Sequence, residues 1–464
     1  MIEQVYKMND EVIAREKRII SWINGQKEQV ERLVEYQLYG RVVRAVGVLL
    51  QVFLPSAKIS DICKIYHSSD QFLYGEVVAI DKHIAKVLPY GQLENISHYS
   101  RVLLMRSGFK IEVGDFLLGK VVNGFGAVTS SLENEKNDID DTDRHYWLSI
   151  NQNAPDPLQR LLINQQLITG ITAIDVFNSC GVGQRMGIFA SPGVGKTTLI
   201  GMLLRNAKAD VCVIVLIGER GREVREFIEL ELDNSLKERC VLIVATSDRP
   251  PVEQVKSAFV GQTIAEYFRD QGKNVLLVMD SVTRFARAQR EVGLSAGEPI
   301  TRGGYPPSVF LSFPRLMERA GMGKSGSITA FYTVLLETED ISKDAVADEV
   351  KSILDGHIIM SRQLAENSVY PAIDLNNSLS RIADRLIPQQ QLKSVKHIKM
   401  LLSKYKELEF LLRIGEYKKG TDPISDESID KYPKVLQLVR QLTAENRVYE
   451  DSVKSLFKLA NVRE

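Results

Sequence analysis

The sequence of 464 residues has no net charge, no closely paired cysteines and no long apolar run. Lysine plus arginine and aspartate plus glutamate each number 59, so the formal net charge is +0. A chain without an excess of basic residues does not hold nucleic acid mainly through a diffuse positive field, although this balance leaves room for a local basic patch.

The cysteines contain no CxxC pair and give no sign of an oxidising compartment. Cys212 lies within the apolar run 211–217, where we expect a reduced and buried thiol. That run is far shorter than the ~20 residues that a membrane-spanning helix needs. The amino terminus lacks the basic-then-apolar pattern of a signal peptide. We therefore expect a cytosolic protein whose contact with a membrane is peripheral.

Hydrophobic residues make up 44% of the chain and charged residues 25%, which is typical of a globular protein and excludes a disordered or collagen-like chain. The length suggests about three domains. Residues 1–35 carry Val12, Ile19, Ile20 and Ile23 at helical spacing, which predicts an amphipathic helix. This helix either packs on its own domain or a neighbouring subunit, or binds a membrane surface or partner, and the sequence favours neither.

Residues 36–108 are predicted to form a small β-barrel domain, because short β-rich runs alternate with Pro, Gly, Ser and Asp. The expected strands lie at 42–53, 75–80, 83–88 and 101–105. The polar and acidic segment 130–143 that follows is expected to be an exposed loop.

Residues 109–387 are predicted to contain a linker and an α/β domain, and residues 388–464 a helical carboxy-terminal domain. Apolar runs that alternate with helix-compatible segments indicate a buried, mostly parallel sheet covered by helices. These runs lie at 187–190, 211–217, 241–245, 275–279 and 328–335. After Pro388 the chain is rich in Lys, Glu, Leu and Gln and shows no strand signal.

The strongest motif is ASPGVGKT at 190–197, between an apolar strand and a helix-compatible run. This is the setting of a P-loop, in which backbone N–H groups and a helix N-terminus hold phosphate oxygens. Lys196 is expected on the β- and γ-phosphates of ATP, and the Thr197 hydroxyl on Mg²⁺. Ala190 replaces the first glycine of the formal pattern. The nucleotide-binding residues expected from this motif are Gly193, Val194, Gly195, Lys196, Thr197 and Thr198.

Two carboxylates follow other predicted strands. Asp280 ends the run 275–280 and is expected to orient the water shell of Mg²⁺, in preference to capping the helix that follows. Glu219 comes directly after the run 211–217, where it would polarise the attacking water or form a surface ion pair with Arg220 or Arg222. The sequence by itself does not choose between these two roles of Glu219.

Several further stretches, in order, resemble the rotary ATPase superfamily: GVGQRMGIF (181–189), IGERGREV (217–224), AEYFRDQG (265–272), YPAID (370–374) and SLSR (378–381). Within that superfamily the chain most closely resembles the ATPases of bacterial type III secretion systems, including their flagellar relatives. This likeness rests on GYPPSVF (304–310), GSITA (326–330), DEVKSILDGH (348–357) and RIGEY (413–417).

The resemblance implies a RecA-like P-loop NTPase core with an N-terminal small β-barrel and a C-terminal helical domain. It also implies a homohexameric ring with nucleotide between subunits. By position, Glu219 resembles the catalytic glutamate of the family, and Arg381 resembles the arginine finger that the adjacent subunit donates; the alternative for Arg381 is a structural ion pair. Tyr370 resembles the aromatic residue that stacks on adenine, and Arg284 would help order the phosphates or Glu219. Ser191 and Pro192 replace the Gly-Ser usual in this group.

The function implied is that of an ATP-hydrolysing motor for type III protein secretion, with ATP and Mg²⁺ as ligands. The implied partners are further copies of the chain, a stator-like regulator or the membrane at the amino-terminal helix, a central coiled-coil stalk, and chaperone–effector complexes on the helical tail. The implied place is the cytoplasmic face of the inner membrane, beside the export apparatus. One alternative is a rotary ATP synthase subunit. The other, a ring translocase on nucleic acid, requires basic and aromatic elements in the barrel; residues 36–107 show no such cluster in sequence, so no nucleic-acid partner is expected.

Overall fold

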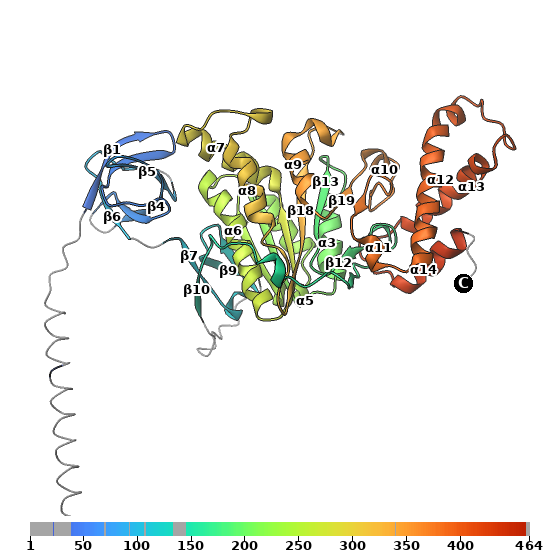
Figure 1. The fold of residues 1–464 in the computed structure, drawn as a ribbon, viewed down its shortest axis with the longest axis horizontal. Coiled ribbons are helices and arrows are strands. Elements are labelled where there is room, and N and C mark those ends of the chain that lie inside the picture. The colour runs from blue at the N-terminus through green and yellow to red at the C-terminus, as the bar shows by residue number, and fades with distance from the viewer. Residues whose placement is uncertain are drawn as a thin grey trace, which may run out of the picture.

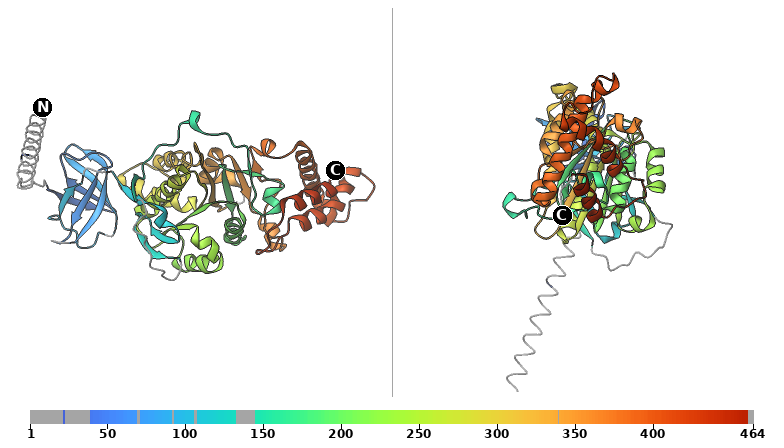
Figure 2. Two further views of the ribbon diagram at one scale, coloured as in Figure 1. Left: turned by 90° about the horizontal axis from the view of Figure 1, so that it is seen from below. Right: turned by 90° about the vertical axis from the view of Figure 1, so that its right-hand side faces the viewer.

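The computed structural model describes residues 22, 39–68, 71–91, 93–105, 108–132, 145–338 and 340–460. They form a β-barrel, a central α/β domain and a helical tail, which lie in a row along the longest axis of the molecule (Figures 1 and 2). The helix expected at residues 1–35 lies outside these ranges apart from Trp22. Most of the acidic segment 130–143 also lies outside them. Its first two residues, Ser130 and Ser131, belong to a strand and not to a loop.

The amino-terminal unit is a closed β-barrel, as the sequence predicts. Its strands, in hydrogen-bonded order, are β1 (Tyr39–Val46), β2 (Leu49–Phe53), β5 (Ile84–Pro89), β4 (Phe72–Asp81), β3 (Ile62–Tyr66) and β6 (Arg101–Leu104). Alternate residues such as Leu50, Val52 and Val87 are buried inside, as the two-residue period of a strand requires. The run 42–53 is not one strand, because Gly47 turns the chain with φ 59° between β1 and β2. Strand β3 was not predicted.

The outer surface of the barrel does gather basic and aromatic side chains, contrary to the expectation from sequence. The ammonium of Lys64 lies 4.4 Å from the ring centroid of Phe72, and the guanidinium of Arg101 lies 5.1 Å from that of Tyr39. These residues are far apart in sequence and become neighbours through the pairing of β1, β6, β3 and β4. Only the strand register creates the cluster.

The central domain is built on a mostly parallel sheet. Its strands follow the order β20 (Leu379–Ser380), β19 (Gly356–Ile359), β13 (Arg185–Ala190), β18 (Ser327–Leu335), β16 (Asn274–Asp280), β14 (Val211–Ile217), β15 (Cys240–Ala245), β8 (Lys120–Asn123) and β9 (Val128–Ser131), with β17 (Gly321–Met322) beside β18. The expected strands are all present. The region after the barrel, predicted only as a linker, contributes β8 and β9, and a ribbon of β7 (Lys110–Val113) and β10 (Tyr146–Ser149).

Helices cover both faces of this sheet (Figure 1). The helices described in this domain are α2 (Thr172–Asp175), α3 (Lys196–Asn206), α4 (Gly221–Leu230), α5 (Asn234–Glu238), α6 (Pro251–Asp270), α7 (Val282–Ala296), α8 (Pro307–Met317), α9 (Ala345–Ile353), α10 (Arg362–Glu366) and α11 (Ala383–Leu386). All seven residues of β14 are buried. Val213, Val215 and Ile217 join the core on one face, and Cys212, Ile214 and Leu216 the core on the other. Two-sided burial explains why β14 reads as an unbroken apolar run.

The tail consists of α12 (Gln389–Arg413), α13 (Pro423–Val439) and α14 (Tyr449–Leu459). Helix α12 begins directly after Pro388, and the Asp422 side chain accepts hydrogen bonds from backbone N–H groups in the first turn of α13. The rings of Tyr405 and Tyr432 stack between α12 and α13, with centroids 3.6 Å apart. Across the described ranges, every helix is too short or too polar to span a bilayer.

Candidate active site

The P-loop joins β13 to α3 at the carboxyl edge of the sheet. Gly193 has φ 79° and Gly195 has φ 90°, which is the left-handed region that glycine adopts without a steric penalty. A Cβ atom on Gly193 would meet nothing within 4 Å. The loop therefore presents open backbone directly before the N-terminus of α3, where N–H groups are free to bind an anion.

Lys196, the first residue of α3, lies between two carboxylates. Its ammonium forms an ion pair with Asp280 Oδ1 and lies 3.9 Å from Glu219 Oε1. Thr197 and Thr198 follow in the first turn, with Thr197 exposed and Thr198 half-buried. The amine expected to bind phosphate is thus held beside the two carboxylates that the sequence singled out.

Asp280 is buried at the end of β16, where the Thr333 hydroxyl of β18 donates a 2.6 Å hydrogen bond to its Oδ1. It is not the cap of the following helix. Ser281 takes that role, because its Oγ accepts a hydrogen bond from the Arg284 N–H of α7. The carboxylate of Asp280 is therefore not used as a helix cap and contacts Lys196 of the P-loop instead. Thr333 was missed from sequence; its place near the carboxyl end of a buried strand, at the edge of the sheet where Asp280 ends β16, was the available signal.

Glu219 faces the same cluster from the end of β14. Its oxygens approach Lys196 and, at 3.7 Å, the Arg284 guanidinium. Burial, followed by the negative charge of Asp280, raises the pKa of Glu219 to about 7, while Lys196 and Arg284 act in the opposite direction. Glu223 shares a hydrogen bond with Glu219, and this bond lowers the pKa of Glu223.

The alternative role of Glu219 as a surface ion pair is wrong. Arg220 lies 3.8 Å from Glu223, and Arg222 lies 3.5 Å from Glu226 on the exposed side of α4. The side chain of Glu219 is only 13% exposed. A buried carboxylate with a raised pKa beside cationic groups is typical of a functional site.

One hydrogen-bond donor of the Arg284 guanidinium is unused in the described part of the chain. Its Nε is buried and has no hydrogen-bond partner in the described part of the chain. A buried guanidinium N–H without a partner is costly unless a ligand or water completes it. Arg284 thus stands beside Glu219 with one donor available to an oxygen atom.

A pocket of about 580 Å³ opens beside the P-loop and includes Tyr370 in its wall. The Tyr370 side chain is partly exposed, and its ring lies against the P-loop: a Cβ atom on Gly195 would be 3.5 Å from the Tyr370 Cε1 atom. The other lining residues are Ser191, Pro192, Gly193, Val194, Leu336, Glu337, Thr338, Arg362, Ala365 and Glu366. A concave site with one aromatic wall next to a phosphate-binding loop has the form of a nucleotide pocket.

Arg381 is not part of this cluster within one chain. It directly follows the edge strand β20 and is exposed. Its backbone N–H donates a hydrogen bond to the Asp355 carbonyl. Its guanidinium lies 3.5 Å from the Lys351 carbonyl, and in the described ranges no carboxylate pairs with it. The alternative of a structural ion pair is therefore wrong.

Comparison with known proteins connects this geometry to a family. The model of the ATP synthase alpha/beta family, nucleotide-binding domain, matches residues 170–380, and that of the T3SS EscN ATPase C-terminal domain matches residues 387–458. The type 3 secretion system ATPase of Xanthomonas euvesicatoria is 47% identical over 419 residues, which cover 90% of this chain and 93% of the relative. The chain belongs to the type III secretion system ATPase family.

Solved structures agree with this assignment. The assembled ATPase EscN from enteropathogenic E. coli has a TM-score of 0.85 and 46% identity, and the match covers 91% of this chain and all of EscN. EscN in complex with its central stalk EscO gives a TM-score of 0.82 at 45% identity, with the same coverage. The predicted family, the fold class and an ATPase activity are confirmed, and the matched C-terminal model favours the secretion ATPase over the synthase subunit.

Proposed function

We propose that this type III secretion ATPase hydrolyses ATP at a site shared by adjacent copies, and that hydrolysis drives protein export, including chaperone release and cargo unfolding. The observation that carries the proposal is the convergence of Lys196, Glu219, Asp280 and Arg284 beside the P-loop. Phosphoryl transfer needs little more than positioned cations and a group that orients water. These residues supply both.

The chemistry follows from the positions of the side chains. The P-loop N–H groups would hold the phosphates of ATP, and the Lys196 ammonium would move from Asp280 to the β- and γ-phosphate oxygens. The Glu219 carboxylate would then orient a water molecule and accept its proton as the water attacks the γ-phosphorus and ADP leaves. A pKa of about 7 suits this task, because a general base is most effective near the working pH.

The residues present fit Mg²⁺ bound together with nucleotide. In the described ranges no group of three or more His, Cys, Asp and Glu residues is placed to hold a metal by itself. Mg²⁺ commonly takes one or two protein oxygens plus substrate phosphates. The Thr197 hydroxyl and the Asp280 carboxylate, which Thr333 orients, would hold it. When bound, Mg²⁺ neutralises phosphate charge.

A second copy of the chain would complete the site. Arg381 is exposed and without a carboxylate partner in the described ranges, as a residue that acts on a neighbour must be before assembly. A planar guanidinium that is always charged suits the developing charge on a transferred phosphoryl group. The assembled form of the relative EscN supports self-association of this chain, and we propose a homohexamer.

Further partners follow from the family. The complex of EscN with EscO supports a central stalk as a partner. We also propose a stator-like regulator or the membrane surface at residues 1–35 and chaperone–effector complexes on the helical tail. The proposed place is the cytoplasmic face of the inner membrane. The relative from Xanthomonas favours a non-flagellar apparatus.

Glu219→Gln tests the proposal, with Glu226→Gln as the matched control on the exposed side of α4. In the purified protein Glu219→Gln should retain nucleotide binding and lose phosphate release. In the bacterium that encodes the chain, it should also abolish secreted substrate, whereas Glu226→Gln should leave both unchanged. Continued export with a subunit that binds ATP without hydrolysing it would contradict the motor role.

The absence of a nucleic-acid partner remains a prediction, which the basic and aromatic side chains on the barrel make worth testing. Phosphate release should be the same with and without single-stranded RNA or DNA. Stimulation that disappears in Lys64→Ala would instead favour a translocase on nucleic acid.

A further inference from the structure

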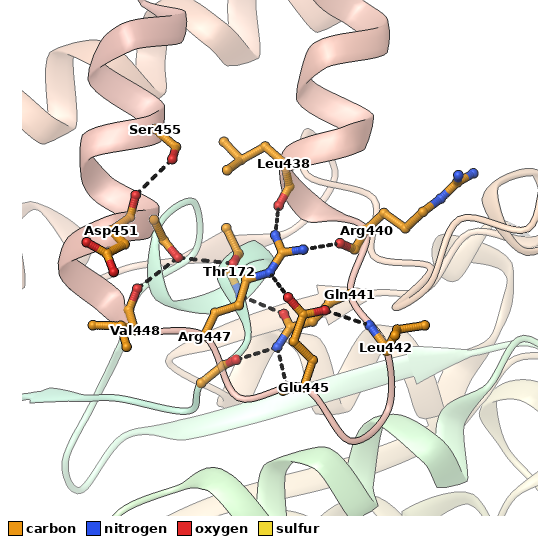
Figure 3. A network of polar contacts seen from close by, with 12 residues as sticks. Thr172, Leu438, Arg440, Gln441, Leu442, Glu445, Arg447, Val448, Asp451 and Ser455 are labelled. Atoms are coloured by element: carbon orange, nitrogen blue, oxygen red, sulfur yellow. Dashed lines mark hydrogen bonds and ion pairs between the residues drawn. The ribbon is translucent and has the colours of Figure 1, made fainter.

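The loop between α13 and α14, residues 440–448, connects the helical tail to the nucleotide-binding domain (Figure 3). Arg447 organises the loop from within. Its guanidinium donates hydrogen bonds to the carbonyls of Leu438 and Arg440 and to the Glu445 carboxylate. A side chain that satisfies several backbone acceptors fixes the path of a loop that has no regular structure of its own.

Gln441 attaches this loop to the segment before the P-loop strand. It is 3% exposed, and its Nε2 donates to the Gly170 carbonyl at 2.6 Å and to the Glu445 carbonyl at 2.7 Å. Its Oε1 accepts a hydrogen bond from the Thr172 N–H at 3.3 Å. Every polar atom of this buried amide thus has a partner, which makes its position specific.

The same residue reaches the nucleotide pocket through its backbone. The N–H of Gln441 donates a 2.8 Å hydrogen bond to the carbonyl of Tyr370, whose ring lies against Gly195 of the P-loop. The Tyr370 hydroxyl makes one further bond, 3.3 Å long, to the Ala365 carbonyl. The tail therefore holds the backbone of the residue that forms the aromatic wall of the pocket.

Two further contacts place the loop against the P-loop helix. Arg205, in the last turn of α3, donates a 3.2 Å hydrogen bond to the Thr443 carbonyl. Gly170 has φ 68°, and a Cβ atom there would lie 2.4 Å from Asn446 Oδ1 and 3.0 Å from Asn206 Cβ. The close fit explains why a glycine is needed where the loop, α3 and the segment before α2 meet.

We propose that Gln441 is a positioning residue for the base of the nucleotide: it holds Tyr370 at the distance from the P-loop at which adenine stacks. The proposal rests on the proposed function, because it takes Tyr370 as the adenine wall. Its consequence is that a displacement of the tail changes the affinity for the base and leaves phosphate binding by the P-loop unaffected.

Equilibrium binding of ADP and of inorganic tripolyphosphate to the full chain tests this separation. ADP carries the base and is not hydrolysed, whereas tripolyphosphate occupies only the phosphate site. Gln441→Met keeps the length of the side chain and removes its hydrogen bonds to Gly170, Glu445 and Thr172. The backbone N–H that donates to Tyr370 remains, so the variant changes only how firmly the loop holds that N–H in place. We expect it to weaken ADP binding about tenfold, within the range of a base-stacking contact, and to leave tripolyphosphate binding unchanged.

Leu442→Met is the matched control, because the neighbouring side chain is 76% exposed, and it should bind both ligands like the wild type. Tyr370→Ala should weaken ADP binding at least as much as Gln441→Met. In the Tyr370→Ala background, Gln441→Met should then have no further effect, because residues that act through one another are not additive. If Gln441→Met fails to fold, Gln441→Glu, which keeps the acceptor for Thr172, replaces it.

The outcomes separate the two proposals. If Tyr370→Ala binds ADP normally, the adenine wall is wrong and so is the nucleotide pose of the proposed function. If Tyr370→Ala weakens ADP binding but Gln441→Met does not, only the role of Gln441 is overturned. Equal loss of ADP and tripolyphosphate binding in Gln441→Met would also overturn it, since that result describes general damage to the domain.

A different contact of the tail leads to the loop that carries Arg381. The Lys399 ammonium, from α12, donates hydrogen bonds to Asn178 Oδ1 at 2.8 Å and to the Ser378 carbonyl at 3.2 Å. Ser378 is 1% exposed, and its Oγ accepts from the Ile359 N–H. The geometry points to Lys399 as a positioning residue for the arginine finger, because it fixes the backbone three residues before Arg381.

Lys399→Met should lower kcat about tenfold, because a small displacement of a catalytic group greatly reduces the reaction rate. The affinity for ADP and the mass of the assembled protein should stay unchanged. Lys396→Met, on the exposed side of α12, is the control. Lys399→Arg, which keeps the charge and donors, should recover part of the rate. Unchanged kcat in Lys399→Met, or a parallel loss of ADP binding, would overturn this role. Unchanged kcat in Arg381→Ala would instead refute the finger itself.

Discussion

The raised pKa of Glu219 predicts how the ATPase depends on pH. As a base, Glu219 must be ionised, so kcat/KM should fall as the pH drops below about 7. At a pH one unit below the pKa, Glu219 is ionised in only about a tenth of the molecules. We therefore expect kcat/KM to be about tenfold lower there. The kcat/KM profile reports the pKa values of the free enzyme, so the midpoint of this fall is the quantity to compare with the pKa of Glu219.

The fall of kcat/KM at low pH is the acid limb of the profile. Two substitutions should shift the midpoint of this acid limb in opposite directions. Arg284 stabilises ionised Glu219 across 3.7 Å. At an effective dielectric constant of about 20, a charge pair at this distance gives about 4 kcal/mol. The Arg284 side chain is 30% exposed, so solvent screens much of this energy. Arg284→Met should therefore raise the pH midpoint of the acid limb by about one unit. Glu223→Gln replaces the carboxylate that accepts from protonated Glu219 with a neutral amide whose NH₂ group can donate to the ionised form, so it should lower the midpoint of the acid limb.

The assay is phosphate release at limiting ATP, from about pH 5.5 to pH 9, with Glu226→Gln as the control that should leave the limb in place. The titration of ATP itself is common to all variants and cancels in the comparison. The position of the limb is measured and not the height of the plateau, so a direct effect of Arg284 on the rate does not interfere. An acid limb that stays in place in both variants would refute the assignment of Glu219 as the base.

Three further predictions concern the P-loop lysine, the residue proposed to act on a neighbouring copy, and the amino-terminal segment. Lys196→Ala should abolish turnover in phosphate-release assays, because no other ammonium approaches Asp280 and Glu219 in the described structure. Arg381→Ala should suppress hydrolysis and preserve both assembly mass and nucleotide binding, since Arg381 lies away from the P-loop of its own chain; loss of binding would contradict its action on a neighbour. Deletion of residues 1–35 should weaken assembly or sedimentation with membranes, and unchanged values for both would count against a role of that segment in contacts.

The sequence predicts the features that depend on local pattern. Unbroken apolar runs are enough to locate β14 and β16, because strands buried on both faces have no alternation to obscure them. The spacing of glycines around Lys196 is enough to place the P-loop. Asp280 could be expected at the site because it ends a buried strand at the edge where open α/β sheets bind ligands.

Features that depend on contacts between distant segments could not be predicted in this way. The choice between two roles of Glu219 required its position relative to Lys196 and Arg284. The barrel cluster around Lys64 and Arg101 arises from strand register. Gln441 and Gly170 are 271 residues apart in sequence, so their hydrogen bond leaves no local signal.

We propose that the site cleaves ATP only where a guanidinium from the next copy completes it. The most direct test measures phosphate release per chain against protein concentration, together with the mass distribution at each concentration. Activity per chain should rise in step with the assembled fraction and vanish as the protein dissociates. Full activity per chain at dilutions where only single copies remain would contradict the account.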